Sequence, residues 1–155
     1  MTATIRSAIA ADIPELARLR WQLYSEQGPH GESSDGFVGR FTTFATDALT
    51  SDDWRAWVAG AEGRLVGAMW LQTIARVPAP GRGEPRPIGY LTNAYVEPEH
   101  RSQGLGSQLL ETVVEHCEAA GFVLVMAWPA DDAYRFYERH GFTRPPDPVV
   151  RRIDR

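Results

Sequence analysis

The chain has 155 residues, 43% of them hydrophobic, with a formal net charge of -4, a pI near 5.5 and one cysteine. A chain of this length buries about 70% of its unfolded surface, so we expect one domain over residues 1–155. The acidic balance disfavours a general nucleic-acid binder, and a single cysteine excludes an internal disulfide. The chain shows no signal peptide and no run of ~20 apolar residues for a membrane span. We therefore expect a cytoplasmic protein that acts on neither nucleic acid nor membrane.

The first half of the chain predicts a strand, two helices and then two strands joined by a tight turn. In that order, the expected ranges are 3–9, 11–28, 35–51, 53–60 and 64–76. Asp12 is expected to cap the first helix, with Pro14 in its first turn.

Four further elements follow a loop at 77–87, where four prolines and two glycines exclude a helix or a central strand. They are a strand, a helix, a strand and a helix, with expected ranges 88–96, 105–120, 122–128 and 131–141. The strand at 122–128 is continuously apolar, which predicts burial on both faces. The tail at 149–155 is expected to supply a final edge strand. The order βααβββαβα(β) indicates an α/β domain with a mixed central sheet flanked by helices.

The turn "RSQGLGS" enters the helix at 105–120. A helix N-terminus presents unpaired backbone N–H groups and a partial positive charge, so it attracts anions. Gly104 and Gly106 remove the Cβ atoms that would block a close approach. Arg101 adds a cation, and three side chains add donors, namely Ser102, Gln103 and Ser107. The turn therefore predicts a phosphate or pyrophosphate site.

Two familiar glycine-rich motifs fit this turn poorly. The dinucleotide fingerprint needs a third glycine where this chain has Leu109, and the P-loop needs a lysine that the turn lacks. From these residues alone, an ordinary strand-to-helix turn is still an alternative.

The stretch "NAYVEPEHRSQGLGSQLL" resembles motif A of the GNAT superfamily, the GCN5-related N-acetyltransferases. Arg101, Gly104 and Gly106 match its Arg/Gln-x-x-Gly-x-Gly/Ala signature, and Val96 and Pro98 match the segment that leads into it.

A second stretch, "AYRFYERHGF", resembles the last-helix pattern of the same family through Tyr137, Gly141 and Phe142. The expected order of elements also agrees with the family along nearly the whole chain. The resemblance implies an acyltransferase that moves an acetyl group from acetyl-CoA to an amine by direct attack in a ternary complex.

The resemblance also implies how acetyl-CoA binds. The pyrophosphate would lie on the glycine-rich turn, whose residues are Arg101, Ser102, Gln103, Gly104, Leu105, Gly106 and Ser107. The pantetheine arm would pair with Ala94, Tyr95 and Val96, like an added strand. A bulge in that strand is a family feature, so simple alternation is expected to fail near 93–96.

For the chemistry, the resemblance implies that Tyr137 protonates the leaving thiolate, although packing on the core is the alternative for a helix aromatic. Glu97 is the candidate base, acting directly or through water, and Asn93 is a candidate to orient that water or the amine. A solvated charge beside Pro98 is the alternative for Glu97. Where the family often has Asn or Ser next to the pantetheine, this chain has Asp131 and Asp132, for which capping of the last helix is the alternative.

The acceptor is expected to be a small amine or a protein amine, with Trp21, Tyr24 and Trp70 as candidate pocket residues. Core packing is the alternative for these aromatic side chains. No metal is expected, because the four histidines lack ligand spacing. Two other functions stay open: a non-catalytic CoA-binding regulatory domain of this fold, and an unrelated phosphate-binding module. Tyr137 argues against the first, and the motif mismatches argue against the second. The resemblance leaves a homodimer open.

Overall fold

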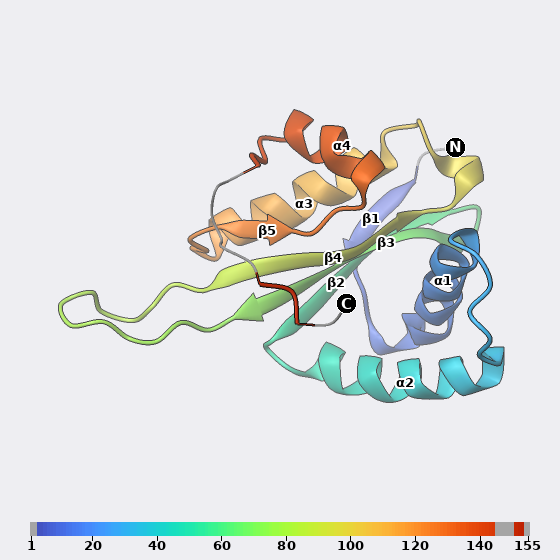
Figure 1. Cartoon of the computed structure of the whole chain (residues 1–155), viewed down its shortest axis with the longest axis horizontal. Helices are drawn as coiled ribbons and strands as arrows, with labels where there is room; N and C mark the ends of the chain where they lie inside the picture. Colours follow the sequence, from blue (N-terminus) through green and yellow to red (C-terminus); the bar gives the residue numbers. More distant parts are fainter. Residues whose placement is uncertain (1–2, 145–150, 154–155) are drawn as a thin grey trace.

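The computed structural model describes residues 3–144 and 151–153 and shows a mixed five-stranded sheet with helices on both faces (Figure 1). The strands are β1 (Thr4–Ser7), β2 (Trp54–Ala61), β3 (Arg64–Ile74), β4 (Ile88–Val96) and β5 (Val125–Ala127). The helices are α1 (Ile13–Glu26), α2 (Ser34–Thr50), α3 (Leu105–Ala119) and α4 (Tyr134–Arg139). This is the fold class that the sequence predicts.

The strands lie in chain order across the sheet. Neighbouring strands from β1 to β4 are antiparallel. Strand β5 runs parallel to β4, because α3 is a crossover helix that returns the chain to the end of the sheet where β4 begins. Helices α1 and α2 cover one face, while α3 and α4 lie on the other (Figure 1). Each face has its own buried core, so the sheet is the central layer of three.

The helix termini differ in detail from the sequence expectations. Asp12 is at the N-cap of α1, but its carboxylate accepts from the Ile9 N–H at 2.8 Å and from Arg6, not from the helix. Gly121 follows the C-cap residue Ala120 of α3 and has φ +76°, so it ends that helix as expected. The last helix is shorter than 131–141, since Asp131 starts a 3-10 turn and α4 begins at Tyr134.

The expectation of a long, doubly buried strand at 122–128 is wrong. Only Val125–Ala127 form β5, and these residues are half-buried. Leu124 and Trp128 are exposed, at 49% and 57%. The physical reason is that β5 pairs only with β4 in the described part of the chain, so it is an edge strand. Val123 and Leu124 still hydrogen-bond through their backbone to Pro87 and Gly89, but they have no strand on their other side. The expected tail strand is absent at 151–153, and its other residues lie outside the described ones.

Candidate active site

The pairing between β4 and β5 ends part-way along β4. The last paired residues are Leu91 and Ala127, although β4 continues to Val96. Within residues 3–144 and 151–153, β4 therefore has no partner on its β5 side from Thr92 onward. An unpaired edge offers backbone donors and acceptors to an extended ligand.

A β-bulge lies in this unpaired part of β4. Ala68 opposes Tyr95 and Trp70 opposes Thr92, so three steps along β4 match two along β3. Asn93 has φ +56°, the left-handed conformation that allows the extra residue. The expected break in alternation near 93–96 is confirmed. The bulge changes the direction of the backbone N–H groups of β4 just beyond the point where its pairing with β5 ends.

The free edge of β4 leads into the glycine-rich turn through a 3-10 turn, Pro98–His100. Gly104 is the N-cap of α3 with φ +82°, which favours glycine. A different argument applies to the glycine at position 106. A Cβ at Gly106 would meet only the Phe136 ring at 3.6 Å, an ordinary contact, so packing alone does not demand glycine there. What its small size leaves open is access to the N–H groups of the first turn of α3.

Arg101 joins this turn to α1. Its Nε donates to the Val96 carbonyl at 2.8 Å, and its Nη2 lies 2.8 Å from Glu26 Oε2. The Tyr95 hydroxyl donates to the same carboxylate at 2.5 Å. The role of Glu26 could not be predicted from the sequence around it, because its partners Tyr95 and Arg101 lie about 70 residues further along the chain. Arg101, which the sequence predicts to face a phosphate, therefore also connects the glycine-rich turn to the C-terminal end of α1.

Two other donors of the turn have partners in the structure. Gln103 Nε2 donates to the Glu99 carbonyl at 3.3 Å, so this side chain closes the turn on itself. Ser107 Oγ lies 2.9 Å from His140 Nε2, which links the first turn of α3 to the end of α4. His140 was not a candidate from the sequence.

Tyr137 comes from α4 and is only 8% exposed. Its ring packs edge-on against Phe136 and Phe142, and it belongs to the core beneath α3. Within the described residues, its hydroxyl makes no hydrogen bond. Burial, with a smaller contribution from Tyr90, raises the pKa of Tyr137 above its usual value. The phenol is therefore protonated at neutral pH and free to donate to a ligand.

A sequence model described as the acetyltransferase (GNAT) family matches residues 13–142, which is most of the chain. The chain belongs to the acetyltransferase (GNAT) family. It is accordingly an acyltransferase, as the two motifs predict. No curated protein matched the sequence.

Solved structures share the whole fold of this GNAT domain at low identity. A predicted acetyltransferase from Clostridium acetobutylicum, solved with acetyl-CoA, has a TM-score of 0.80 at 19% identity, over 97% of this chain and 96% of that one. A GCN5-related N-acetyltransferase from Ralstonia eutropha has 0.79 at 21%, over 98% and 99%. The glucosamine-6-phosphate N-acetyltransferase of Arabidopsis thaliana has a TM-score of 0.72 at 20% identity, over 99% of this chain and 100% of that one.

None of the helices in the described part of the chain has the length and hydrophobicity that a membrane span requires.

Glu97 of this GNAT domain is a buried ion-pair centre, only 2% exposed, and not a solvated charge. Oε1 lies 2.5 Å from Arg18 Nη1 and 2.7 Å from Arg64 Nη1. Burial opposes ionisation of Glu97, but hydrogen bonds from Arg64 and Arg18 outweigh it and hold its pKa below the usual range. Arg18 also donates to the Leu65 carbonyl, so the network links α1, β3 and the end of β4.

We expect Glu97→Gln to lower the free energy of unfolding by about 1–2 kcal/mol, because both arginines lose a charge-assisted partner. The loss stays modest since Arg18 and Arg64 are 34% and 43% exposed and water screens them. The folded pKa of Glu97 is lowered, so its contribution is complete above about pH 4.5 and declines as the pH falls further. Urea unfolding between pH 3 and 7 measures this.

The exposed neighbour Glu99 provides the control, since Glu99→Gln removes the same charge without breaking an ion pair of the described residues. Equal stability curves for the two variants would contradict the structural role of Glu97.

Glu97, Glu99 and His100 also offer ligand atoms that lie within 4.8 Å of one another. His100 Nδ1 is buried without a hydrogen-bond partner among the described residues, 4.0 Å from Glu97 Oε2. The two guanidinium groups on Glu97 oppose a further cation, so this cluster does not suit a metal.

The candidate acceptor residues do not come together. Trp70 is only 4% exposed and packs with Phe41, Phe44 and Trp54 under α2, so it offers no open surface, contrary to expectation. Trp21 contacts the ring of His30, before α2, and that of Phe37, within α2, so it joins α1 to both. Tyr24 is 46% exposed on α1, and Asn93 lies at the bulge.

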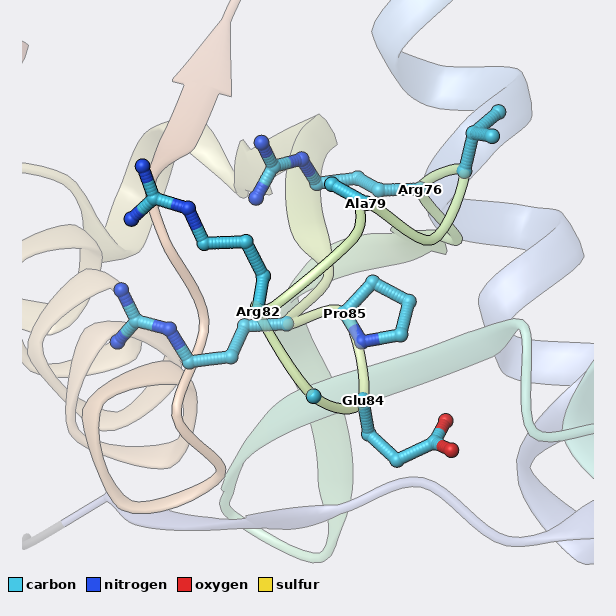
Figure 2. Close-up of a pocket in the computed structure, with 8 residues that line it drawn as sticks. Arg76, Ala79, Arg82, Glu84 and Pro85 are labelled. Carbon is cyan, nitrogen blue, oxygen red and sulfur yellow. The ribbon is translucent and has the colours of Figure 1, made fainter.

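A separate concavity of about 570 Å³ lies in the long connection between β3 and β4, which projects from the body of the molecule (Figure 1). Figure 2 shows the guanidinium groups of Arg76 and Arg82 on one side of this loop and Glu84 pointing the other way. The loop joins the ends of β3 and β4 that are farthest from the glycine-rich turn, so we do not assign it to acetyl transfer.

Proposed function

We propose that this GNAT domain transfers an acetyl group from acetyl-CoA to an amine by direct attack within a ternary complex. The observation that carries the proposal is the unpaired, bulged end of β4, which leads through the short 3-10 turn into the glycine-rich N-terminus of α3. A ligand with an extended amide-containing arm and a pyrophosphate matches both parts. The similar C. acetobutylicum acetyltransferase was solved with acetyl-CoA, which supports the same cofactor here.

In this proposal the backbone N–H groups from Arg101 to Ser107 hold the pyrophosphate, helped by the partial charge of α3. The pantetheine arm pairs with the free edge of β4 at Ala94, Tyr95 and Val96. Its thioester then lies near the bulge at Asn93, where a re-aimed backbone N–H donates a hydrogen bond to the carbonyl oxygen as negative charge develops on it.

The amine nitrogen attacks the thioester carbon with its lone pair, forming the C–N bond while the carbonyl electrons move to oxygen. Collapse of this intermediate breaks the C–S bond and leaves a thiolate. Tyr137 donates its phenolic proton to that sulfur, a role supported by its protonated state and its free hydroxyl. Coenzyme A and the N-acetylated product then leave.

The amine must lose a proton before or during attack. Glu97 was the candidate base, but two guanidinium partners and a lowered pKa make its carboxylate a weak proton acceptor. We therefore propose that Glu97 positions the end of β4, and that water takes the proton. Asn93 stays the candidate to orient that water.

The fold does not select the acceptor. Solved structures of the same fold include the A. thaliana glucosamine-6-phosphate N-acetyltransferase and an aminoglycoside acetyltransferase from a soil metagenomic sample. A transcriptional regulator from Bacillus halodurans also shares the fold, which keeps a non-catalytic CoA-binding domain as the second candidate. The free hydroxyl of Tyr137 favours the enzyme.

We expect acetyl-CoA to raise the melting temperature by several degrees and ATP to raise it much less. A ligand specific for the folded state adds about 2.7 kcal/mol at 100 times its dissociation constant, which is a visible shift for a domain of this size. Thermal-shift titration checks binding, and thiol release against a panel of amines then checks turnover. No shift at millimolar acetyl-CoA would exclude both CoA-dependent functions.

A further inference from the structure

Arg20 is a cation on the sheet-facing side of α1. It lies one helical turn after the buried Leu16 and one turn before Tyr24, so the three share one side of the helix. The side chain is half-buried, with Cζ 4.5 Å from the centre of the Tyr24 ring. Its hydrogen bond to the Tyr24 hydroxyl, donated by Nη2, is long at 3.5 Å.

Among the residues that the structure describes, Arg20 has no counter-ion, in contrast to Arg18 and Arg101. Arg18 on the same helix pairs with Glu97, and Arg101 pairs with Glu26. In residues 3–144 and 151–153, no carboxylate lies within ion-pair distance of Arg20. Its desolvation lowers the pKa of the guanidinium, and the nearby Tyr24 and Tyr90 only partly oppose this. A partly buried charge without a partner is unfavourable, and such exceptions occur where a ligand supplies the partner.

Helix α1 lies against the free end of β4, and Arg20 lies between two of its contacts there. Arg18 pairs with Glu97, which directly follows β4, and Glu26 accepts from the Tyr95 hydroxyl at 2.5 Å. Leu16, one turn before Arg20, belongs to the core on the α1 face of the sheet, whereas Tyr137 belongs to the core on the other face. Arg20 therefore lies on the helix that covers the unpaired end of β4, on the opposite face of the sheet from the proposed acid.

Building on the proposed function, we propose that Arg20 binds an anionic group of the acceptor, so that the substrate is an amine that also carries a carboxylate or a phosphate. The planar guanidinium has donors that match either group in a bidentate arrangement, and a half-buried site strengthens that interaction. The same charge would repel a polycationic acceptor such as a polyamine.

The test compares acceptors that differ only in the anionic group. Ethanolamine phosphate is paired with ethanolamine, and β-alanine with β-alaninamide, so the two pairs separate phosphate from carboxylate. Thiol release should give a kcat/KM at least about tenfold higher for the anionic member of one pair. In Arg20→Gln that kcat/KM should fall on the order of 100-fold, mainly through KM, because a charged partner is lost. The neutral member should change less than about threefold.

Arg55→Gln is the matched control, since Arg55 also lies over an aromatic ring, at 5.9 Å from Trp57, with no ion pair among the described residues. It should leave both members of each pair unchanged. The melting temperature of Arg20→Gln without ligand should equal or exceed that of the wild type, because a desolvated charge has been removed.

Three results would overturn the inference: equal or better turnover of the neutral amines by the wild type, the same loss for both members in Arg20→Gln, or a lower melting temperature of that variant. Acetyl-CoA binding without thiol release to any amine would instead reject the proposed function, and this inference with it.

Discussion

Tyr137→Phe is expected to lower kcat by about 10²–10⁴-fold, the usual range for a positioned general acid. The ring packs against Phe136 and Phe142, and the hydroxyl has no hydrogen bond within the described residues, so the substitution leaves the fold intact. The KM for acetyl-CoA should change far less, because the proton is needed when charge develops on sulfur. Steady-state thiol release by wild type and variant measures both constants.

Tyr134→Phe is the matched control, because Tyr134 begins the same helix but lies under Arg144, outside the core that holds Tyr137. A thioester with a better leaving thiol should shrink the defect of Tyr137→Phe, since its sulfur needs less help. Normal turnover by Tyr137→Phe would make Tyr137 a packing residue. Loss of acetyl-CoA binding would instead make the hydroxyl a ground-state contact and leave the mechanism without its acid.

The second large effect is expected for Gly106→Val, which should weaken acetyl-CoA binding by about 100-fold or more while the domain stays folded. The added side chain would fill the space in front of the N–H groups of α3, which the pyrophosphate needs. Inside the protein, a Cβ there meets only the Phe136 ring at 3.6 Å, so the cost to the fold is small. Isothermal titration with acetyl-CoA and circular dichroism measure the two properties.

Gly39→Val provides the control, since Gly39 lies inside α2 and a Cβ there meets nothing within 4 Å. Gly104 is a poorer test, because its φ of +82° would strain valine whether or not a ligand binds. Unchanged acetyl-CoA affinity in folded Gly106→Val would return the turn to an ordinary strand-to-helix connection.

Local sequence patterns were sufficient for most elements of the fold. Apolar spacing along the chain predicted nine elements in the observed order, and Gly121 marked the end of α3. The glycine-rich turn could be located because a helix N-terminus and residues without Cβ atoms are adjacent in the chain. The bulge near Asn93 was expected from the family resemblance, and the register confirms it.

Only the tertiary structure decided what depends on partners far away in the chain. The apolar run at 122–128 predicts a buried strand, yet its burial is set by the neighbours of β5, which the run does not encode. Glu97 is charged beside a proline in the sequence, but contacts with Arg18 and Arg64 make it a buried ion pair. Periodicity reports the side of an element that is apolar, whereas the partner of a charge depends on packing between elements. For that reason the sequence by itself determined the glycine-rich turn at the start of α3, and the tertiary structure decided which charges are paired and that Arg20 has no such partner in the described chain.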